Sequence, residues 1–319
     1  MLRFSMTCLA LAACVADPDA DPTESTTEQE INGDTHAAVG WMTDSAVAIA
    51  GQTSTGWQRK CTGTLIAPRF VITAAHCKVT TADRVFYFTT NDGMDLSRPG
   101  FINSVQLRPG VNPFVSDLDD SSGKFADIAV VKLSASDPDA LAAEMWWRYP
   151  GADAPGYKVG AGKHDGFVNE DAELRFVDDT TDSSSDNDGS FMTTHVRVDN
   201  GDSGGPFYGT LHRVLGVLSG SLWDGDSAIY RGYYTSIPEH LEFVLDAIEF
   251  SWPYGLTTNT FVSGALLEQF TSGPKTCAYA CLRTPACVAF NNFPSTGLCQ
   301  QLATVTGVSN ASGWRSHIK

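Results

Sequence analysis

Short apolar runs separated by turn residues dominate the chain from Ile31 to about Tyr234. Gly, Pro and Asp lie between these runs, where the chain would have to turn. Many short strands separated by such turn residues predict an all-β barrel or sandwich. The expected strands are Ala46–Ala50, Gly63–Ile66, Phe70–Thr73, Val85–Phe88, Ile128–Leu133, Val214–Leu218 and Tyr230–Tyr234.

The hydrophobic period changes after the last of these runs. Apolar residues recur at helical spacing over Pro238–Phe250, which predicts a helix there. Residues 251–257 contain Pro and Gly and are expected to form a linker. Residues 258–319 carry four clustered Cys and are predicted to be a small module of their own.

The N-terminal segment has the pattern of an export signal followed by a tether. Residues 1–13 combine a basic start with a short apolar core, as signal peptides do. The small residues before Cys14 resemble a bacterial lipobox, which makes Cys14 a candidate for lipidation; the alternative is an ordinary secretory signal with a chance Cys. Residues 14–30 are acidic and poor in apolar surface, so we expect a flexible tether.

The composition narrows the range of partners. The 319 residues include 21 Lys and Arg against 37 Asp and Glu, a net charge of −16. Recognition of nucleic acid needs a basic footprint, so no nucleic-acid partner is expected. No run of about 20 apolar residues occurs, so we expect membrane contact only through a lipid anchor at Cys14. The expected location is secreted or at the cell surface.

The cysteines also divide the chain into two parts. Of the eight Cys, Cys8 and Cys14 lie in the signal region, which leaves an even number beyond it. Export permits disulfides, and an even number suits complete pairing. The remaining cysteines are Cys61, Cys77, Cys277, Cys281, Cys287 and Cys299. The long gap after the first two again indicates two modules.

The sharpest chemical signal is the segment Gly201–Pro206, which reads GDSGGP. A Ser nucleophile needs an exposed hydroxyl, a base, and backbone N–H groups aimed at the developing oxyanion. The glycines around Ser203 would let the backbone approach a substrate closely. Alone, the segment could equally be a Gly- and Ser-rich turn.

Two further segments supply the groups that such a Ser requires. His76 follows a predicted strand in the segment TAAHC, beside a Cys that could fix its position. Asp127 opens the apolar strand DIAVVKL. Each residue alone is a weak signal, but a catalytic imidazole needs a third group that holds its tautomer. The other His residues show no metal-ligand spacing, so neither a metal nor a cofactor is expected.

Together the three segments resemble the trypsin/chymotrypsin-like serine protease family, whose members carry the same groups in the order His, Asp, Ser. The resemblance covers about residues 31–250. It implies two packed antiparallel β-barrels with a C-terminal helix, and an active site between the barrels. It also implies a serine endopeptidase that hydrolyses protein or peptide substrates through an acyl-enzyme.

The resemblance gives each catalytic residue a role. Ser203 would attack the scissile carbonyl, His76 would carry the proton to the leaving amine, and Asp127 would orient His76. The N–H groups of Gly201 and Ser203 would form the oxyanion hole.

The resemblance also implies an activation step and a disulfide. In the family, a newly cut N-terminal Ile or Val pairs with the Asp before the nucleophile, which here is Asp202. Ile31 is the candidate N-terminus, although INGD departs from the usual Ile-Val-Gly-Gly. The alternative is that Ile31 is merely the first ordered residue. Cys61–Cys77 would be the disulfide that tethers the His turn.

The specificity pocket departs further from the family pattern. Arg197 occupies the position at its base, where Asp would imply cleavage after Lys or Arg. An acidic substrate residue would suit Arg197 if its side chain enters the pocket; another preference follows if Arg197 pairs with a local carboxylate. Ser219, Gly220 and Ser221 match the segment that pairs with the substrate backbone and lines the pocket wall.

The last four cysteines resemble those of the PAN/apple fold, a small disulfide-stapled α+β domain. The resemblance covers about residues 258–319 and implies a protein or carbohydrate ligand; the alternative is a structural appendage without a ligand. Cys277–Cys299 and Cys281–Cys287 are the expected pairs, although four Cys allow three connectivities. A zinc site is the rival interpretation, which an oxidising compartment disfavours.

These expectations combine into a secreted or surface-anchored serine endopeptidase that a C-terminal module targets. The alternative is a catalytically inactive, protease-like scaffold that only binds. The presence of His76, Asp127 and Ser203 together favours the enzyme, since a binder would not need all three.

Overall fold

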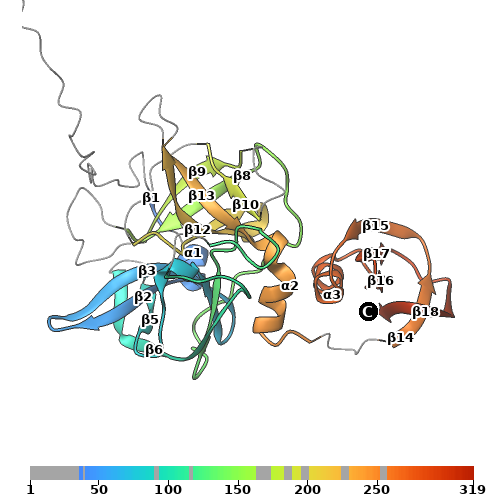
Figure 1. Ribbon diagram of the computed structural model, residues 1–319, viewed down its shortest axis with the longest axis horizontal. Coiled ribbons are helices and arrows are strands. Elements are labelled where there is room, and N and C mark those ends of the chain that lie inside the picture. The colour runs from blue at the N-terminus through green and yellow to red at the C-terminus, as the bar shows by residue number, and fades with distance from the viewer. Residues whose placement is uncertain are drawn as a thin grey trace, which may run out of the picture.

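A computed structural model describes residues 36–38, 40–89, 93–114, 118–162, 174–182, 189–194, 201–223, 230–251 and 257–319. In these ranges the chain forms two β-lobes, a helix beside them and a smaller C-terminal unit (Figure 1). The expectations for residues 1–30, for Ile31 and for Arg197 concern positions outside the described residues.

The first lobe is a closed barrel of six antiparallel strands in the order β2-β3-β4-β7-β6-β5. Closure leaves no unpaired sheet edge in this lobe. The apolar run of β4 is buried along its whole length, which explains its lack of polar alternation. The strands are β2 (Ala46–Thr53), β3 (Gly56–Ala67), β4 (Phe70–Thr73), β5 (Arg84–Thr89), β6 (Gly93–Leu107) and β7 (Ala129–Leu133).

The second lobe is a seven-stranded antiparallel sheet in the order β1-β9-β8-β11-β12-β13-β10. This strand order does not confirm the second closed barrel that the resemblance implied, although an isolated antiparallel bridge between Thr181 and Thr193 joins the ends of β9 and β10. Phe191, Phe207 and Tyr234 form its aromatic core, with the Phe191 and Tyr234 rings stacked 5.3 Å apart. The strands are β1 (His36–Ala37), β8 (Pro155–Gly160), β9 (Arg175–Thr180), β10 (Ser190–Met192), β11 (Pro206–Gly209), β12 (Val214–Trp223) and β13 (Tyr230–Ser236).

The predicted helix after the second lobe is α2, Ile237–Ala247. Pro238 suits its first turn, where no backbone donor is needed. The helix ends before the expected Phe250 because Glu249 has a left-handed backbone, φ 58°. No helix in the described part of the chain is long and apolar enough to cross a membrane. The shorter helices are α1 (Gly40–Ser45), η1 (Ala75–Cys77) and η2 (Thr210–His212).

The C-terminal unit packs one helix on a five-stranded antiparallel sheet in the order β14-β18-β16-β17-β15. Disulfides Cys277–Cys299 and Cys281–Cys287 join the helix to the sheet and to the turn that follows it. The α+β architecture agrees with the expected class, while the PAN/apple assignment stays a prediction. The elements are β14 (Thr257–Ser263), β15 (Leu266–Thr271), α3 (Pro274–Arg283), β16 (Ala289–Phe293), β17 (Leu298–Leu302) and β18 (Gly307–Ile318).

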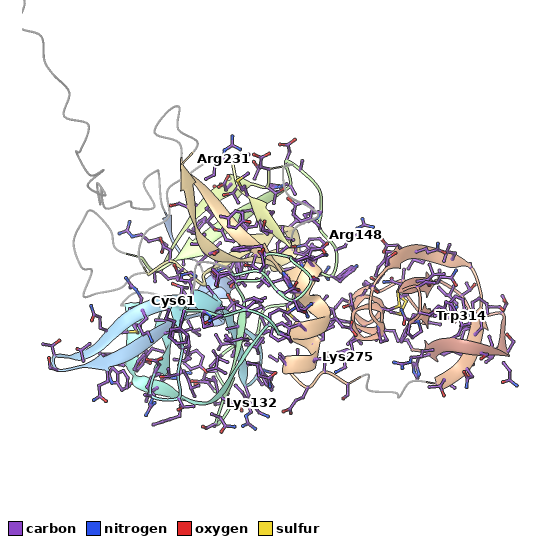
Figure 2. All side chains as sticks on the ribbon, viewed as in Figure 1. Cys61, Lys132, Arg148, Arg231, Lys275 and Trp314 are labelled. Carbon is purple, nitrogen blue, oxygen red and sulfur yellow. A yellow bond between two sulfur atoms is a disulfide. The ribbon has the colours of Figure 1, made fainter. Side chains whose placement is uncertain are left out.

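Helices α2 and α3 join the C-terminal unit to the two lobes (Figure 1). Tyr279 of α3 belongs to the buried cluster that also contains the barrel and α2 side chains. Glu242 of α2 accepts hydrogen bonds from the first N–H groups of α3. Lys275 pairs with Asp246, and Figure 2 shows Lys275 and Arg148 at this junction. The unit is therefore docked rather than loosely tethered.

Candidate active site

His76 lies in the turn after β4, inside η1. The disulfide Cys61–Cys77 joins this turn to β3, so the backbone beside His76 is covalently fixed to the barrel. The imidazole is 32% exposed, which leaves it open toward the solvent side. The turn therefore presents a partly accessible base on a rigid support.

The Asp127 carboxylate is fully buried and receives three contacts. Its Oδ1 accepts the His76 N–H at 2.8 Å, and its Oδ2 lies 2.6 Å from His76 Nδ1. The Ser219 hydroxyl donates to the same Oδ2 at 2.5 Å. A buried carboxylate needs such partners to remain charged. With Nδ1 directed at Asp127, Nε2 is the nitrogen that can accept a proton.

The turn Gly201–Gly204 lies between the two lobes. Thr62 of β3 donates its N–H to the Ser203 carbonyl at 2.8 Å and its hydroxyl to the Gly201 carbonyl at 2.7 Å. From the other lobe, the Leu218 carbonyl of β12 accepts the Gly204 N–H at 2.7 Å. The backbone around Ser203 is thus held by one strand of each lobe.

Gly204 is sterically required in this turn. Its φ of +82° is left-handed, and a Cβ there would lie 2.1 Å from Thr73 Oγ1 and 2.3 Å from the Thr62 carbonyl oxygen. Thr73 ends β4, directly before the His76 turn. The Ser and His segments are therefore fixed to each other by close packing.

The Ser203 hydroxyl makes no hydrogen bond to His76 among the described residues. Such catalytic contacts are often long in a resting enzyme and shorten when substrate binds. The backbone arrangement already brings the two residues to one place, because Cys77 Sγ lies 3.9 Å from the Ser203 carbonyl oxygen.

Asp202 turns away from solvent into the second lobe, where it is 1% exposed. Its Oδ1 accepts the Gly162 N–H at 2.5 Å. A Cβ on Gly160 or Gly162 would lie 2.1 or 2.5 Å from Oδ1, so these glycines make room for the carboxylate. The amine expected to pair with Asp202, that of Ile31, lies outside the described residues.

A buried ion pair lies close to the turn Gly201–Gly204. Lys158 Nζ of β8 is 2.6 Å from Asp179 Oδ2 of β9, and the two side chains are 1% and 0% exposed. Burial lowers the pKa of Lys158, and the negative charges of Asp179 and Asp202 oppose that shift. Charges this deep persist because each compensates the other. The sequence analysis did not find this pair, since its two members lie on different strands.

The residues expected to bind substrate lie along β12. No atom of the described residues lies within 4 Å of the position that a Cβ on Gly220 would take, so this stretch borders open space in the described part of the chain. Ser221 pairs with Gly232 of β13. The Ser219 hydroxyl faces Asp127 instead of open space, a contact that the sequence analysis missed. Arg197 lies outside the described residues.

One cluster in the described part of the chain has the spacing of metal ligands. Ligand atoms of Cys61, His76 and Cys77 all lie within 4.8 Å of one another. The two sulfurs are joined in a disulfide and cannot act as thiolate ligands. We therefore assign this cluster to the support of His76 and not to a metal.

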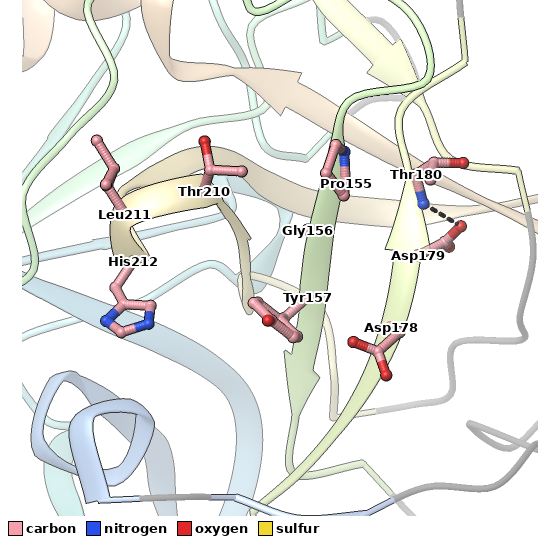
Figure 3. A pocket seen from close by; sticks show the side chains of 9 residues that line it. All are labelled: Pro155, Gly156, Tyr157, Asp178, Asp179, Thr180, Thr210, Leu211 and His212. Atoms are coloured by element: carbon pink, nitrogen blue, oxygen red, sulfur yellow. Dashed lines mark hydrogen bonds between the residues drawn. The ribbon is translucent and has the colours of Figure 1, made fainter.

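A hollow of about 510 Å³ opens on the second lobe, between η2 and strands β8 and β9 (Figure 3). Leu211 and His212 stand on one side of it, and Tyr157 and Asp178 on the other. A second hollow, of about 590 Å³, lies at the junction with the C-terminal unit. Neither is lined by Ser203, so both lie apart from the candidate catalytic centre.

The family model for trypsin matches residues 32–244. The chain belongs to the trypsin family. Membership supports a serine protease function in general and implies protein or peptide substrates. The match ends before the C-terminal unit, which it therefore leaves unassigned.

Solved structures of trypsin-like proteins share the fold. Neuropsin, a serine protease expressed in the limbic system of mouse brain, gives a TM-score of 0.55 at 17% identity, covering 67% of this chain and 99% of its own. Human heparin binding protein gives 0.54 at 17% identity, covering 70% and 99%. No curated protein matches the sequence. At these identities the likeness concerns the fold alone.

Proposed function

We propose that this trypsin-family chain is an active serine endopeptidase in which Ser203 is the nucleophile, His76 the base and Asp127 the orienting carboxylate. The observation that supports this most directly is the buried Asp127 carboxylate, 2.6 Å from His76 Nδ1. A negative charge in that place stabilises the imidazolium that forms when Nε2 takes up a proton.

The reaction follows from these positions. Ser203 Oγ attacks the scissile carbonyl carbon while its proton passes to His76 Nε2. The N–H groups of Gly201 and Ser203 stabilise the oxyanion, an effect worth about 10²–10³ in rate for each donor. His76 then gives the proton to the leaving amine, and the acyl-enzyme forms. Water, activated by His76, attacks the acyl-enzyme and restores Ser203.

Substrate would lie with its acyl side along Ser219, Gly220 and Ser221, and the open space beside Gly220 supports this. Arg197 is the proposed base of the specificity pocket. Substrates are proteins or peptides, as the family implies.

The remaining assignments rest on the sequence. We propose a signal peptide at residues 1–13, a tether at 14–30, a protease domain at 31–250, a linker at 251–257 and a PAN/apple-like domain at 258–319. The linker would be shortened at its end, since β14 already begins at Thr257. Secretion fits the three disulfides, which form in oxidising compartments.

Activation and anchoring are further parts of the proposal. Cleavage before Ile31 would create an amine that pairs with Asp202, whose carboxylate is already buried in a glycine-lined site. Lipidation at Cys14 would hold the uncut chain on a membrane, and the same cleavage would release it. A protein or carbohydrate ligand of the C-terminal unit would target the enzyme.

A fluorophosphonate probe tests the proposal, because it reacts with an activated serine. We expect mass spectrometry to locate the label at Ser203 in a form that starts at Ile31. Ser203→Ala should abolish labelling and nearly all peptide hydrolysis, while Ser97→Ala, at an exposed serine of β6, should change neither.

Comparison with a form that starts at Cys14 tests the activation step. Stronger labelling of the Ile31 form would support activation by cleavage, and equal labelling of both forms would remove it. Folded protein that takes up no label in either form would contradict the enzyme and favour a binding scaffold.

A further inference from the structure

The hollow between η2 and strands β8 and β9 is supported by packed aromatic rings. Trp41 of α1 stacks on His212, with ring centroids 3.8 Å apart and planes 9° apart. Trp41 also meets Tyr157 and Tyr208 edge-on, at centroid distances of 6.0 and 5.0 Å. Tyr208 is fully buried and shares a hydrogen bond of 2.7 Å with Ser45. The hollow of about 510 Å³ therefore has fixed walls and the size of a ligand site.

A carboxylate stands beside one of these rings. Tyr157 of β8 and Asp178 of β9 lie directly opposite each other in an antiparallel pair, so their side chains share one face of the sheet. Both line the hollow (Figure 3). Asp178 is exposed, and within the described part of the chain it makes no hydrogen bond or ion pair. The hollow thus presents a negative charge next to an aromatic ring.

The other charged groups around the hollow do not compensate this charge. Asp179 also borders the hollow, but its buried carboxylate pairs with Lys158 at 2.6 Å. No Lys or Arg is among the described residues that line the hollow. The whole chain carries a net charge of −16, which adds to the negative potential. These charges favour a cationic ligand over an anionic one.

The opposite rim consists of two residues in an uncommon backbone conformation. Leu211 and His212 have left-handed φ values of 64° and 57°. Bulky residues rarely adopt this conformation, and it tends to occur where a binding site requires it. The turn holds the Leu211 side chain 72% exposed at the edge of the hollow. It therefore offers an apolar surface on the side opposite Asp178 (Figure 3).

These features match the side chain of a lysine or an arginine. Its charged end would form a charge-assisted hydrogen bond to Asp178 and would be attracted by the face of the Tyr157 ring. Its methylene stem would lie against Leu211, because long basic side chains cover apolar surface with their stems. A neutral sugar could stack on Tyr157 but would not compensate the charge of the carboxylate.

The hollow lies on the lobe that follows the turn Gly201–Gly204. Strand β11 begins at Pro206, just after Ser203, and leads to η2 at the edge of the hollow. Its four residues span about 13 Å at ~3.3 Å per residue. A substrate bound at Ser203 could therefore reach the hollow only with a segment several residues away from the scissile bond.

We propose that this hollow is an exosite, a binding site apart from the catalytic centre, for a Lys or Arg side chain of a protein substrate. The side chain belongs to a segment outside the residues that flank the scissile bond. This inference rests on the proposed peptidase function. It adds a recognition point that is separate from Arg197 and from the segment of β12 proposed to bind the acyl side.

Binding is measured first, without turnover, in the Ser203→Ala form. The probe is a fluorescein-labelled Gly- and Ser-based peptide with several lysines, and its counterpart carries acetyl-lysine at the same positions. Fluorescence anisotropy at fixed ionic strength gives Kd for each. We expect the Lys peptide to bind about tenfold more tightly than the acetylated one, because acetylation removes the positive charge.

Substitutions then assign this binding to the hollow. Asp178→Asn should weaken binding of the Lys peptide by about five- to tenfold. Asp139→Asn is the charge-matched control at a carboxylate that is 78% exposed and does not line the hollow, and it should change Kd by less than about twofold. Leu211→Gly suits the left-handed backbone and should not lower Tm, yet it should weaken binding about threefold because the stem loses its apolar contact.

Turnover assigns the site to the substrate. A denatured protein that the wild type cleaves is presented with its lysines either native or acetylated. Asp178→Asn should lower kcat/KM for the native form about fivefold, mainly through KM, and should leave the acetylated form unchanged. A short peptide that spans only the scissile bond should be cleaved equally by both enzymes.

The outcomes separate the inference from the proposed function. Binding of the Lys peptide that survives Asp178→Asn, or that falls equally in Asp139→Asn, would overturn the inference, since net charge alone would then explain it. Binding of neutral oligosaccharides in place of the Lys peptide would overturn it in favour of a carbohydrate ligand. A folded chain that binds the Lys peptide through Asp178 but takes up no label at Ser203 would refute the peptidase, and with it the assignment of the exosite to a substrate.

Discussion

Replacement of Tyr279 tests whether the C-terminal unit is an integral part of the protease. Tyr279 is 4% exposed and belongs to the same buried cluster as the barrel and α2. Its hydroxyl accepts the Met145 N–H at 3.0 Å, and Met145 is itself buried. Its ring meets Phe250 edge-on, with centroids 5.7 Å apart. The side chain thus links the last helix of the chain to the core of the lobes.

These contacts set the expected size of the effect. Tyr279→Phe removes the acceptor of a buried N–H, which costs about 1–3 kcal/mol. Tyr279→Ala also removes the ring, and losses of about 3–5 kcal/mol are typical for buried aromatic residues. At roughly 2–4 °C per kcal/mol for a domain of this size, Phe should lower Tm by about 2–12 °C and Ala by more.

The assay follows calorimetric melting and loss of peptidase activity on heating in parallel. If the unit is integral, both transitions shift together in the two variants. Arg148→Ala is the control at the same junction, because the exposed pair of Arg148 with Glu268 contributes only about 0–1 kcal/mol. Inactivation that stays at the wild-type temperature in Tyr279→Ala would refute the reasoning, since the lobes would then fold independently of α3.

Three further predictions concern the site and its surroundings. Ser219→Ala removes a hydrogen bond to the Asp127 carboxylate that is worth about 1.5–3 kcal/mol. Steady-state kinetics should therefore show kcat reduced about 10- to 100-fold with KM little changed, and a change confined to KM would contradict this. Burial lowers the pKa of His240 below its usual 6.5, so the unfolded chain takes up a proton at a higher pH than the folded chain does. We therefore expect Tm to fall as the pH drops below about 6.5. His240→Gln should flatten this dependence of Tm on pH, and an unchanged slope would exclude His240 as its source. Glu242→Gln weakens the hydrogen bonds to the start of α3, so urea unfolding should show a free energy of unfolding lower by about 0.5–2 kcal/mol. An unaltered free energy of unfolding would show that the backbone N–H groups find other partners.

The barrel and the catalytic candidates were accessible from the sequence because both depend on local patterns. Apolar runs such as Phe70–Thr73 predict buried strands, and β4 has the predicted bounds. His76 and Ser203 stand in short segments whose residues suit their turns, as the steric need for Gly204 illustrates.

Contacts between distant segments were not accessible in the same way. Ser219 reaches Asp127 across 92 positions, and no local pattern distinguishes its hydroxyl from other exposed ones. No local pattern marks Lys158 as buried, yet its partner Asp179 on the neighbouring strand makes it a buried ion. The end of α2 depended on the left-handed backbone of Glu249, a residue type that rarely adopts it.

The placement of the turn Gly201–Gly204 also affects how the protein folds. A protease is a hazard to its own unfinished copies, which offer extended chain to any active neighbour. Here the bond from Thr62 to Gly201 spans 139 positions, and contacts of such separation close late because of their loop entropy. Peptidase activity would thus appear only when both lobes have assembled, and partly folded copies would be unable to digest one another.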